Sequence, residues 1–190
     1  MKRILVAMSL LLIAVSLGPI CRADQSHVVY LPLLLMSPGV DAVAEPGPDP
    51  GPCVSDDANW WAYEELIALI NEERVADGLA SLTPSGELAE AARRHTEDMV
   101  EQGSLCHIGS DGSTPGQRIR AARYEWLACG EVVALGPGCP RVILNLWLRS
   151  PDHRAILTDG DLRDVGVARA PDPAGRGYYW TVDLGIRQRP

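Results

Sequence analysis

Apolar residues recur at spacings of three and four over several stretches of the chain, a period that predicts amphipathic helices with one face in a core. The first helix is expected to begin near Asp57, which can cap it, and to end at Gly78. A second helix is expected between Ser85, as its N-cap, and Gly103. The apolar face of this second helix contains Leu88, Ala92, His95 and Met99.

The pattern then changes from helices to strands. Residues 114–117, Thr-Pro-Gly-Gln, form a capping box with proline at the first helical position, which predicts a short third helix. A fourth helix is predicted over about 140–149, and Pro151 is expected to end it. Residues 164–168 and 178–184 are predicted as strands. Helices followed by a small antiparallel sheet predict an α+β fold in which helices cover that sheet.

The N-terminal part has a different pattern. Residues 1–23 contain a basic start, an apolar run and small residues before a cleavage point, which predicts a signal peptide cut after Ala23 and hence export. An uncleaved membrane anchor is the alternative. Residues 24–56 combine the apolar run Val28–Met36, which either docks on the domain or pairs with a partner as an adhesive strand, with a spacer rich in proline and glycine. The folded domain is expected over residues 57–190.

Composition narrows the possible functions. The chain has 190 residues, of which 46% are hydrophobic and 22% charged, so one packed domain is expected. The net charge of −8 argues against a nucleic-acid partner, which requires a basic face, and against adhesion to anionic lipid by charge alone. Removal of the leader leaves four cysteines, an even number that suggests two disulfides in an exported protein, although the spacing does not fix their pairing.

Three side chains are candidates for a binding or catalytic site. His107 precedes a polar loop, His153 follows the predicted end of the fourth helix, and Glu131 lies between them in the sequence. Two imidazoles and a carboxylate at the ends of different elements can share one cleft, although the spacing alone does not bring them together. His95, on the apolar face of the second helix, is expected to be a buried, hydrogen-bonded core histidine.

Short motifs occur in an order that resembles a known family. These motifs are Asn71-Glu72-Glu73-Arg74, Gly78-Leu79, Gly109-Ser110-Asp111-Gly112, Gly130-Glu131, Ser150-Pro151-Asp152-His153-Arg154, Val165-Gly166-Val167 and Tyr179-Trp180-Thr181. Their order resembles the CAP superfamily of cysteine-rich secretory, venom antigen and pathogenesis-related proteins, and above all its bacterial SCP-like branch. The resemblance covers about residues 60–185 and implies an α-β-α sandwich, a small antiparallel sheet covered by helices on both faces.

The resemblance also implies a cavity. The family's cavity is typically lined by two histidines and two glutamates, and the matching motifs place His107, Glu131 and His153 there. Ser150 stands where the second glutamate usually lies, and Val132 replaces the usual asparagine. Two imidazoles and a carboxylate meet the ligand count of an open zinc site, so Zn²⁺ or another divalent cation is one expected occupant, with no cofactor required. The alternative is a metal-free hydrogen-bonded network of the same groups.

The shared cavity suggests a disulfide pairing. Cys106 precedes His107 and Cys129 lies two residues before Glu131, so a common cavity would bring the two cysteines close. We therefore expect the bridges Cys106–Cys129 and Cys53–Cys139.

The resemblance implies a secreted, non-enzymatic binding module for an extracellular or cell-envelope ligand, with a small apolar, lipid or sterol-like molecule as one candidate. The first alternative is a hydrolase, metal-dependent or not, that acts on peptides or cell-envelope polymers. No residue is assigned a catalytic role, because a triad drawn with Ser150 lacks the glycine-flanked turn that exposes a nucleophilic serine. The second alternative is a structural surface protein held out on the linker.

Overall fold

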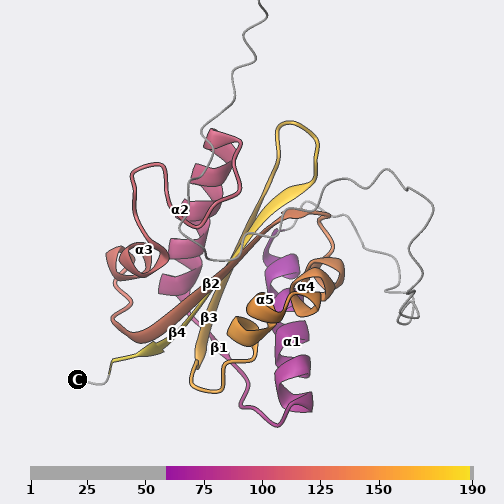
Figure 1. The fold of residues 1–190 in the computed structure, drawn as a ribbon, viewed down its shortest axis with the longest axis vertical. Helices are drawn as coiled ribbons and strands as arrows, with labels where there is room; N and C mark the ends of the chain where they lie inside the picture. Colours follow the sequence, from indigo (N-terminus) through magenta and orange to yellow (C-terminus); the bar gives the residue numbers. More distant parts are fainter. Residues whose placement is uncertain (1–58, 189–190) are drawn as a thin grey trace, which may run out of the picture.

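The fold is a four-stranded sheet with helices on both faces (Figure 1). The structure is a computed structural model that describes residues 59–188. The leader, the apolar run, the linker and Cys53 lie outside this range. The elements, in chain order, are α1 Asn59–Ala76, β1 Thr83–Pro84, α2 Gly86–Gln102, α3 Pro115–Ala121, β2 Trp126–Gly136, α4 Pro140–Arg149, α5 Pro151–Leu157, β3 Asp164–Pro171 and β4 Tyr178–Arg187.

The strands follow the spatial order β1-β3-β4-β2. The three long strands pair antiparallel, and β4 lies between β3 and β2. The short β1 pairs parallel to β3, which adds one parallel contact to the expected antiparallel sheet. In the β2–β4 register, Glu131 lies opposite Asp183, so the two carboxyl side chains project from the same face.

Each face of the sheet is covered by its own helices. One face carries the largest core, in which α1, α4 and α5 pack on alternate residues of the strands, including Val132 and Val182. The other face carries α2 and α3 and two smaller clusters. Met99 of α2 packs with Val133 and Tyr179 in one of them, and Ile119 of α3 packs with Leu88 of α2 in the other. This arrangement confirms the expected α+β sandwich.

The local signals for helix ends are confirmed. Ser85 caps α2 by accepting a hydrogen bond from the Leu88 N–H, and Gly103 ends that helix in the left-handed region at a φ of 61°. Thr114 and Gln117 form the expected reciprocal capping box at the start of α3. These contacts depend only on residues close in sequence, which is why the sequence reveals them.

Two elements differ from the sequence-based expectation. The strand β2 was not predicted from the sequence. Most of its residues are shielded on both faces, and polar and apolar residues do not alternate along it, so the sequence lacks the period of a strand there. The helix α5 begins at Pro151, which was expected only to end the preceding helix. Proline is also favoured at the first position of a helix, because it has no N–H to leave unsatisfied. His153 therefore lies within a helix.

No helix among residues 59–188 is both long and apolar enough to cross a bilayer.

Arg74 joins three parts of the fold around the end of α1. Its side chain is fully buried and donates to four backbone carbonyl groups. The acceptors are Ala80 at 3.0 Å, Leu157 at 2.8 Å, Asp159 at 2.9 Å and Leu162 at 3.1 Å. Asn71, one turn earlier, exchanges two hydrogen bonds with the backbone of Leu82. Both residues therefore brace a helix against loops.

Replacing Arg74 by methionine should reduce the free energy of unfolding by about 3 kcal/mol or more, because several buried carbonyl groups lose their donors at once. Urea unfolding followed by circular dichroism measures this difference. The matched control is Arg154→Met, which removes an arginine whose salt bridge to Asp77 is largely exposed. The control should change stability by less than about 0.5 kcal/mol. Equal losses in the two variants would contradict the bracing assigned to Arg74.

Candidate functional site

A buried carboxylate lies at the centre of the candidate site. Glu131 projects from β2 toward α2 and α3 and is only 4% exposed. Its Oε1 accepts a hydrogen bond from Nδ1 of His107 at 2.7 Å, and its Oε2 accepts one from Arg118 at 2.6 Å. A buried negative charge is tolerated only when it is paired and hydrogen-bonded, and both carboxylate oxygens meet that condition.

Arg118 also fixes the loop that precedes α3. Its guanidinium donates to the carbonyl groups of Ser113 at 2.8 Å and His107 at 3.0 Å, in addition to Glu131. Burial by itself raises the pKa of Glu131, but the hydrogen bond from His107 and the positive charge of Arg118 reverse this effect and lower it. The carboxylate is therefore ionised, and it holds both ends of the loop through these two partners.

His95 lies beside this group. It is buried on α2, and its Nε2 donates to the Cys106 carbonyl oxygen at 2.7 Å, which confirms the expected hydrogen-bonded core histidine. The same Nε2 lies 3.7 Å from Oε1 of Glu131. Burial lowers the pKa of His95, so the ring is neutral at pH 7. The histidine expected to be purely structural therefore contacts the site.

His153 does not join His107 and Glu131. It lies on α5, which covers the opposite face of the sheet, and its Nδ1 forms a 2.7 Å hydrogen bond with Oγ of Ser150. Glu131 points away from α5, because its neighbour Gly130 is the residue that faces Ile156 of that helix. The structure thus brings together two of the three predicted residues and places Ser150 with His153 at a helix junction.

The residues around Glu131 do not fit a zinc ion. His107 is hydrogen-bonded directly to the carboxylate, and the guanidinium of Arg118 supplies the positive charge beside it. A divalent cation at that place would meet electrostatic repulsion from Arg118. Within the part of the chain that the structure describes, no group of three or more His, Cys, Asp and Glu side chains is arranged to hold a metal ion.

The expected Cys106–Cys129 bridge is wrong. Cys129 is a free thiol, half-buried near Gly116 of α3 and packed against the cluster around Leu88 and Tyr124. Burial raises the pKa of this thiol to about 11. Cys106 is next to His107, and Cys129 lies two residues before Glu131. The hydrogen bond between His107 and Glu131 links these two segments, but it does not orient the cysteine side chains toward each other. The Cys53–Cys139 bridge stays a prediction, because Cys53 lies outside the described residues.

Asp183 is a site residue that the sequence analysis missed. It lies opposite Glu131 on β4, is fully buried, and neither carboxyl oxygen has a hydrogen-bond partner among the described residues. Burial and the nearby charge of Glu131 raise the pKa of Asp183 well above its ordinary value. A signal was available, because an acidic residue interrupts an otherwise apolar run in a predicted strand.

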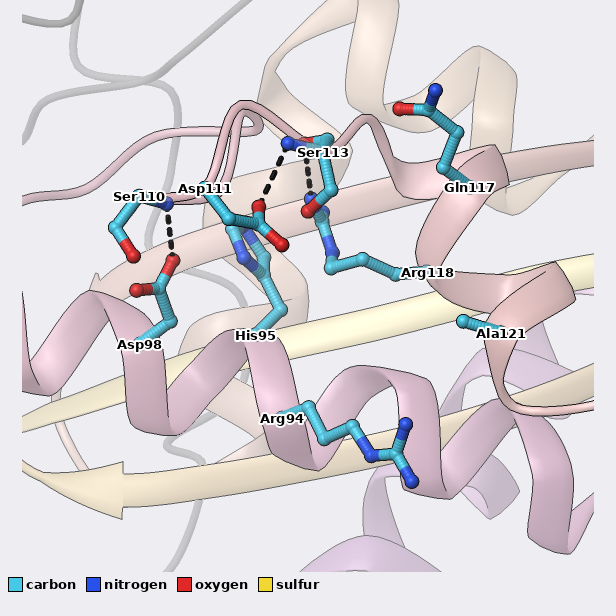
Figure 2. A pocket seen from close by; sticks show the side chains of 9 residues that line it. All are labelled: Arg94, His95, Asp98, Ser110, Asp111, Ser113, Gln117, Arg118 and Ala121. Atoms are coloured by element: carbon cyan, nitrogen blue, oxygen red, sulfur yellow. Dashed lines mark hydrogen bonds between the residues drawn. The ribbon is translucent and has the colours of Figure 1, made fainter.

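A pocket of about 410 Å³ opens above this buried group (Figure 2). It lies between α2, α3 and the loop over residues 109–113. Most of its lining residues are polar or charged, but much of the surface that they present is that of their carbon atoms. The lining residues are Arg94, His95, Asp98, Ser110, Asp111, Ser113, Gln117, Arg118 and Ala121. Figure 2 shows the Arg118 side chain running from α3 toward His95 beneath the loop. Arg118 thus connects the pocket to Glu131.

The loop over the pocket is a structured turn. The Ser113 N–H donates to Asp111 at 2.8 Å, and the Ser110 N–H donates to Asp98 of α2 at 2.8 Å. Gly112 lies in the left-handed region at a φ of 83°. The loop is therefore held on one side by α2 and on the other by Arg118.

One family model and two curated proteins have sequences similar to this chain. A model described as the cysteine-rich secretory protein family, CAP, matches residues 67–184. The uncharacterised protein YkwD of Bacillus subtilis is 26% identical over 121 residues, which are 63% of this chain and 46% of that protein. The uncharacterised membrane protein YlbC of the same organism is 29% identical over 116 residues, 61% of this chain and 32% of that protein. The chain thus spans less than half the length of either relative.

Two solved structures have a similar fold. An extracellular protein containing an SCP domain from Bacillus anthracis has a TM-score of 0.62 and 22% identity over 68% of this chain and 41% of its own. An outer surface protein from Borrelia burgdorferi has a TM-score of 0.61 and 26% identity over 66% of this chain and 92% of its own. These structures support the sandwich described above.

Replacing Asp183 by asparagine should make the protein progressively more stable than the wild type as the pH rises above about 4. The pKa of Asp183 is raised in the folded state. Folding of the wild type therefore becomes less favourable as the pH rises above the ordinary pKa of an aspartate in the unfolded chain. Asparagine does not titrate, so the difference between the proteins should grow with pH. Urea unfolding at several pH values measures it, with Asp161→Asn at an exposed site as the control. A constant difference would contradict the assignment.

The position of His153 predicts the result of a zinc titration. Calorimetry should give the same Zn²⁺ affinity, or the same absence of binding, for the wild type and His153→Ala, because His153 lies across the sheet from Glu131. His107→Ala serves as the comparison on the Glu131 side. A tenfold loss of affinity in His153→Ala alone, about 1.4 kcal/mol, would show that His153 contributes to a metal site.

Proposed function

Since the chain belongs to the cysteine-rich secretory protein (CAP) family, we propose that it is an extracellular, non-enzymatic binding module whose ligand occupies the pocket between α2 and α3. The similarity to an extracellular SCP-domain protein and to an outer surface protein supports the location. The predicted signal peptide agrees with it.

The observation that carries the proposal is the pocket above Glu131. Its volume of about 410 Å³ lies in the ordinary range for small-molecule sites. Arg118, in its wall, is held by Glu131 and by two backbone carbonyl groups. The wall is therefore fixed before a ligand arrives, which reduces the entropy lost on binding.

The same geometry favours binding over hydrolysis. A general base needs an oxygen or nitrogen within reach of the proton that it abstracts. Both oxygens of Glu131 are engaged, by His107 and Arg118, and the side chain is buried below the pocket. Ser150 and His153, the other candidates for hydrolytic chemistry, lie at the junction of α4 and α5.

The lining offers both hydrogen-bonding groups and apolar surface. Eight of the nine lining residues are polar or charged, and Ala121 is the exception. Most of the surface that these residues present to the pocket is nevertheless apolar, because it comes from the carbon atoms of their side chains. We therefore propose a small molecule that combines apolar groups with a few hydrogen-bonding groups.

Filling the pocket tests the proposal. Ala121 is exposed at the end of α3 and lines the pocket, so Ala121→Trp should block the site without disturbing the core. The matched control is Ala174→Trp, at an exposed position in the turn between β3 and β4. A mixture of amino acids, monosaccharides and small carboxylic acids is screened by saturation-transfer NMR against the full chain and both variants.

Compounds that bind the wild type and Ala174→Trp should lose at least about tenfold in affinity for Ala121→Trp. Retention of binding by Ala121→Trp would place the ligand elsewhere. No binding by any compound would favour the structural surface protein over the binding module.

A further inference from the structure

Two buried carboxyl groups lie opposite each other in the sheet. The β2–β4 register pairs Glu131 with Asp183, and these residues are 4% and 0% exposed. The Cβ atoms of directly opposed residues in an antiparallel pair lie about 5 Å apart, so the two carboxyl groups are within reach of each other. Two negative charges at this distance in the interior would repel each other strongly, because little water is present to screen them.

The groups that face this pair neutralise only one negative charge. The titratable groups are Arg118 of α3, His95 of α2, His107 of the loop and Cys129 of β2. Arg118 carries the only permanent positive charge of these described groups and already binds Glu131. On β3, the residue paired with Asp183 is Gly166, and the acid of that strand, Asp164, accepts a hydrogen bond from the Tyr124 hydroxyl at 2.6 Å.

Asp183 avoids a second buried charge when it is a neutral acid. As a carboxylate it would have no hydrogen-bond donor within reach among the described residues. As a carboxylic acid it donates its own proton to Glu131, and burial together with the charge of Glu131 raises the pKa of Asp183 well above its ordinary value. The pair therefore holds one proton and one negative charge, and Arg118 balances that charge.

The loop over residues 107–113 is attached to the domain through the same carboxylate. Ile108 and residues 110–112 are exposed, so the loop has little apolar packing of its own. His107 binds Glu131, Arg118 binds the carbonyl groups at both ends of the loop, and the Ser110 N–H binds Asp98. Segments with few buried apolar contacts open locally at a lower free energy than the whole domain unfolds.

We infer that Glu131 and Asp183 form a proton-operated latch: their shared proton favours the closed loop over residues 107–113, and the loop opens more often as the pH rises. In the open loop water reaches the pair, so Asp183 can lose its proton and ionise. Each unit of pH above the ordinary range of an aspartate then favours the open loop by up to about tenfold, until the pH passes the raised pKa of Asp183 in the closed loop. The latch operates whether or not a ligand occupies the pocket.

Hydrogen exchange of the full chain measures the opening. The Ser110 and Ser113 N–H groups report on the loop, and the Ile143 N–H reports on α4 across the sheet. The ratio of the intrinsic to the observed exchange rate gives the protection of each amide and removes the direct effect of pH on exchange. From about pH 5 to about pH 8, protection of the loop amides should fall by more than about tenfold, and by more than that of Ile143.

A matched pair of variants isolates the proton of Asp183. Asp183→Asn keeps the size of the side chain and can donate an N–H to Glu131, but it cannot lose that proton by ionising. Protection of the loop amides should therefore not change with pH in this variant. Asp161→Asn, at an exposed position, should behave as the wild type.

Carbon NMR of the wild type detects the proton without a variant. At about pH 6, where exposed aspartates are ionised, the carboxyl carbon of Asp183 should have the chemical shift of a protonated acid. Titration of Asp183 together with the exposed aspartates would overturn the inference, because the pair would then share no proton.

Two results of the exchange experiment would also overturn the latch. Loop protection that falls equally in the wild type and Asp183→Asn would show that opening is independent of the Asp183 proton. Loop protection that falls only in step with Ile143 would show that the whole domain opens. Neither result bears on ligand binding, which the Ala121→Trp screen tests separately.

Discussion

The site depends on neutralising one buried charge. Glu131 is held in the interior by the sheet, and an ionised carboxylate there is stable only with partners that carry hydrogen-bond donors and positive charge. His107 and Arg118 supply them from the two ends of one loop. The carboxylate therefore ties the start of the loop and the helix that follows it to the sheet, and so contributes to the shape of the pocket that the loop covers.

The sheet separates two kinds of interior. The face under α1, α4 and α5 is almost entirely apolar and contains the largest core cluster. The face under α2 and α3 carries the polar groups, Glu131 and Asp183 on neighbouring strands with His95 above them. Gly166 of β3 lets α2 approach closely, since a Cβ at that position would lie 2.0 Å from the backbone of Ala89. One face therefore supplies most of the apolar packing, and the other carries the pocket.

The polar face also contains a carboxyl group whose burial is unfavourable, and this fits a functional role for that face. Asp183 is buried without a hydrogen-bond partner among the described residues, and its raised pKa is the signature of an unfavourable environment for its charge. Proteins tolerate such groups most often near functional sites. Asp183 lies opposite Glu131, so this unfavourable group is part of the candidate site.

Features that depend on near neighbours are predictable from the amino-acid sequence. The capping of α2 by Ser85 and the capping box at Thr114 each join residues three positions apart. The apolar periods and the family motifs indicated the overall sandwich. The family resemblance grouped His107 with Glu131 in one cavity; the structure joins them by a 2.7 Å hydrogen bond, although neither lines the pocket.

Tertiary contacts set which residues share a face of the sheet. His153 was grouped with Glu131, but neighbouring residues of β2 point to opposite faces, and a strand in which polar and apolar residues do not alternate does not show which residue faces which way. Arg118 became recognisable as a site residue only when α3 packed beside β2 and placed its guanidinium against Glu131. The place of Asp183 in a predicted strand was a signal, but its pairing with Glu131 depends on the register of β2 and β4, and contacts between residues far apart in the chain leave no period in the sequence.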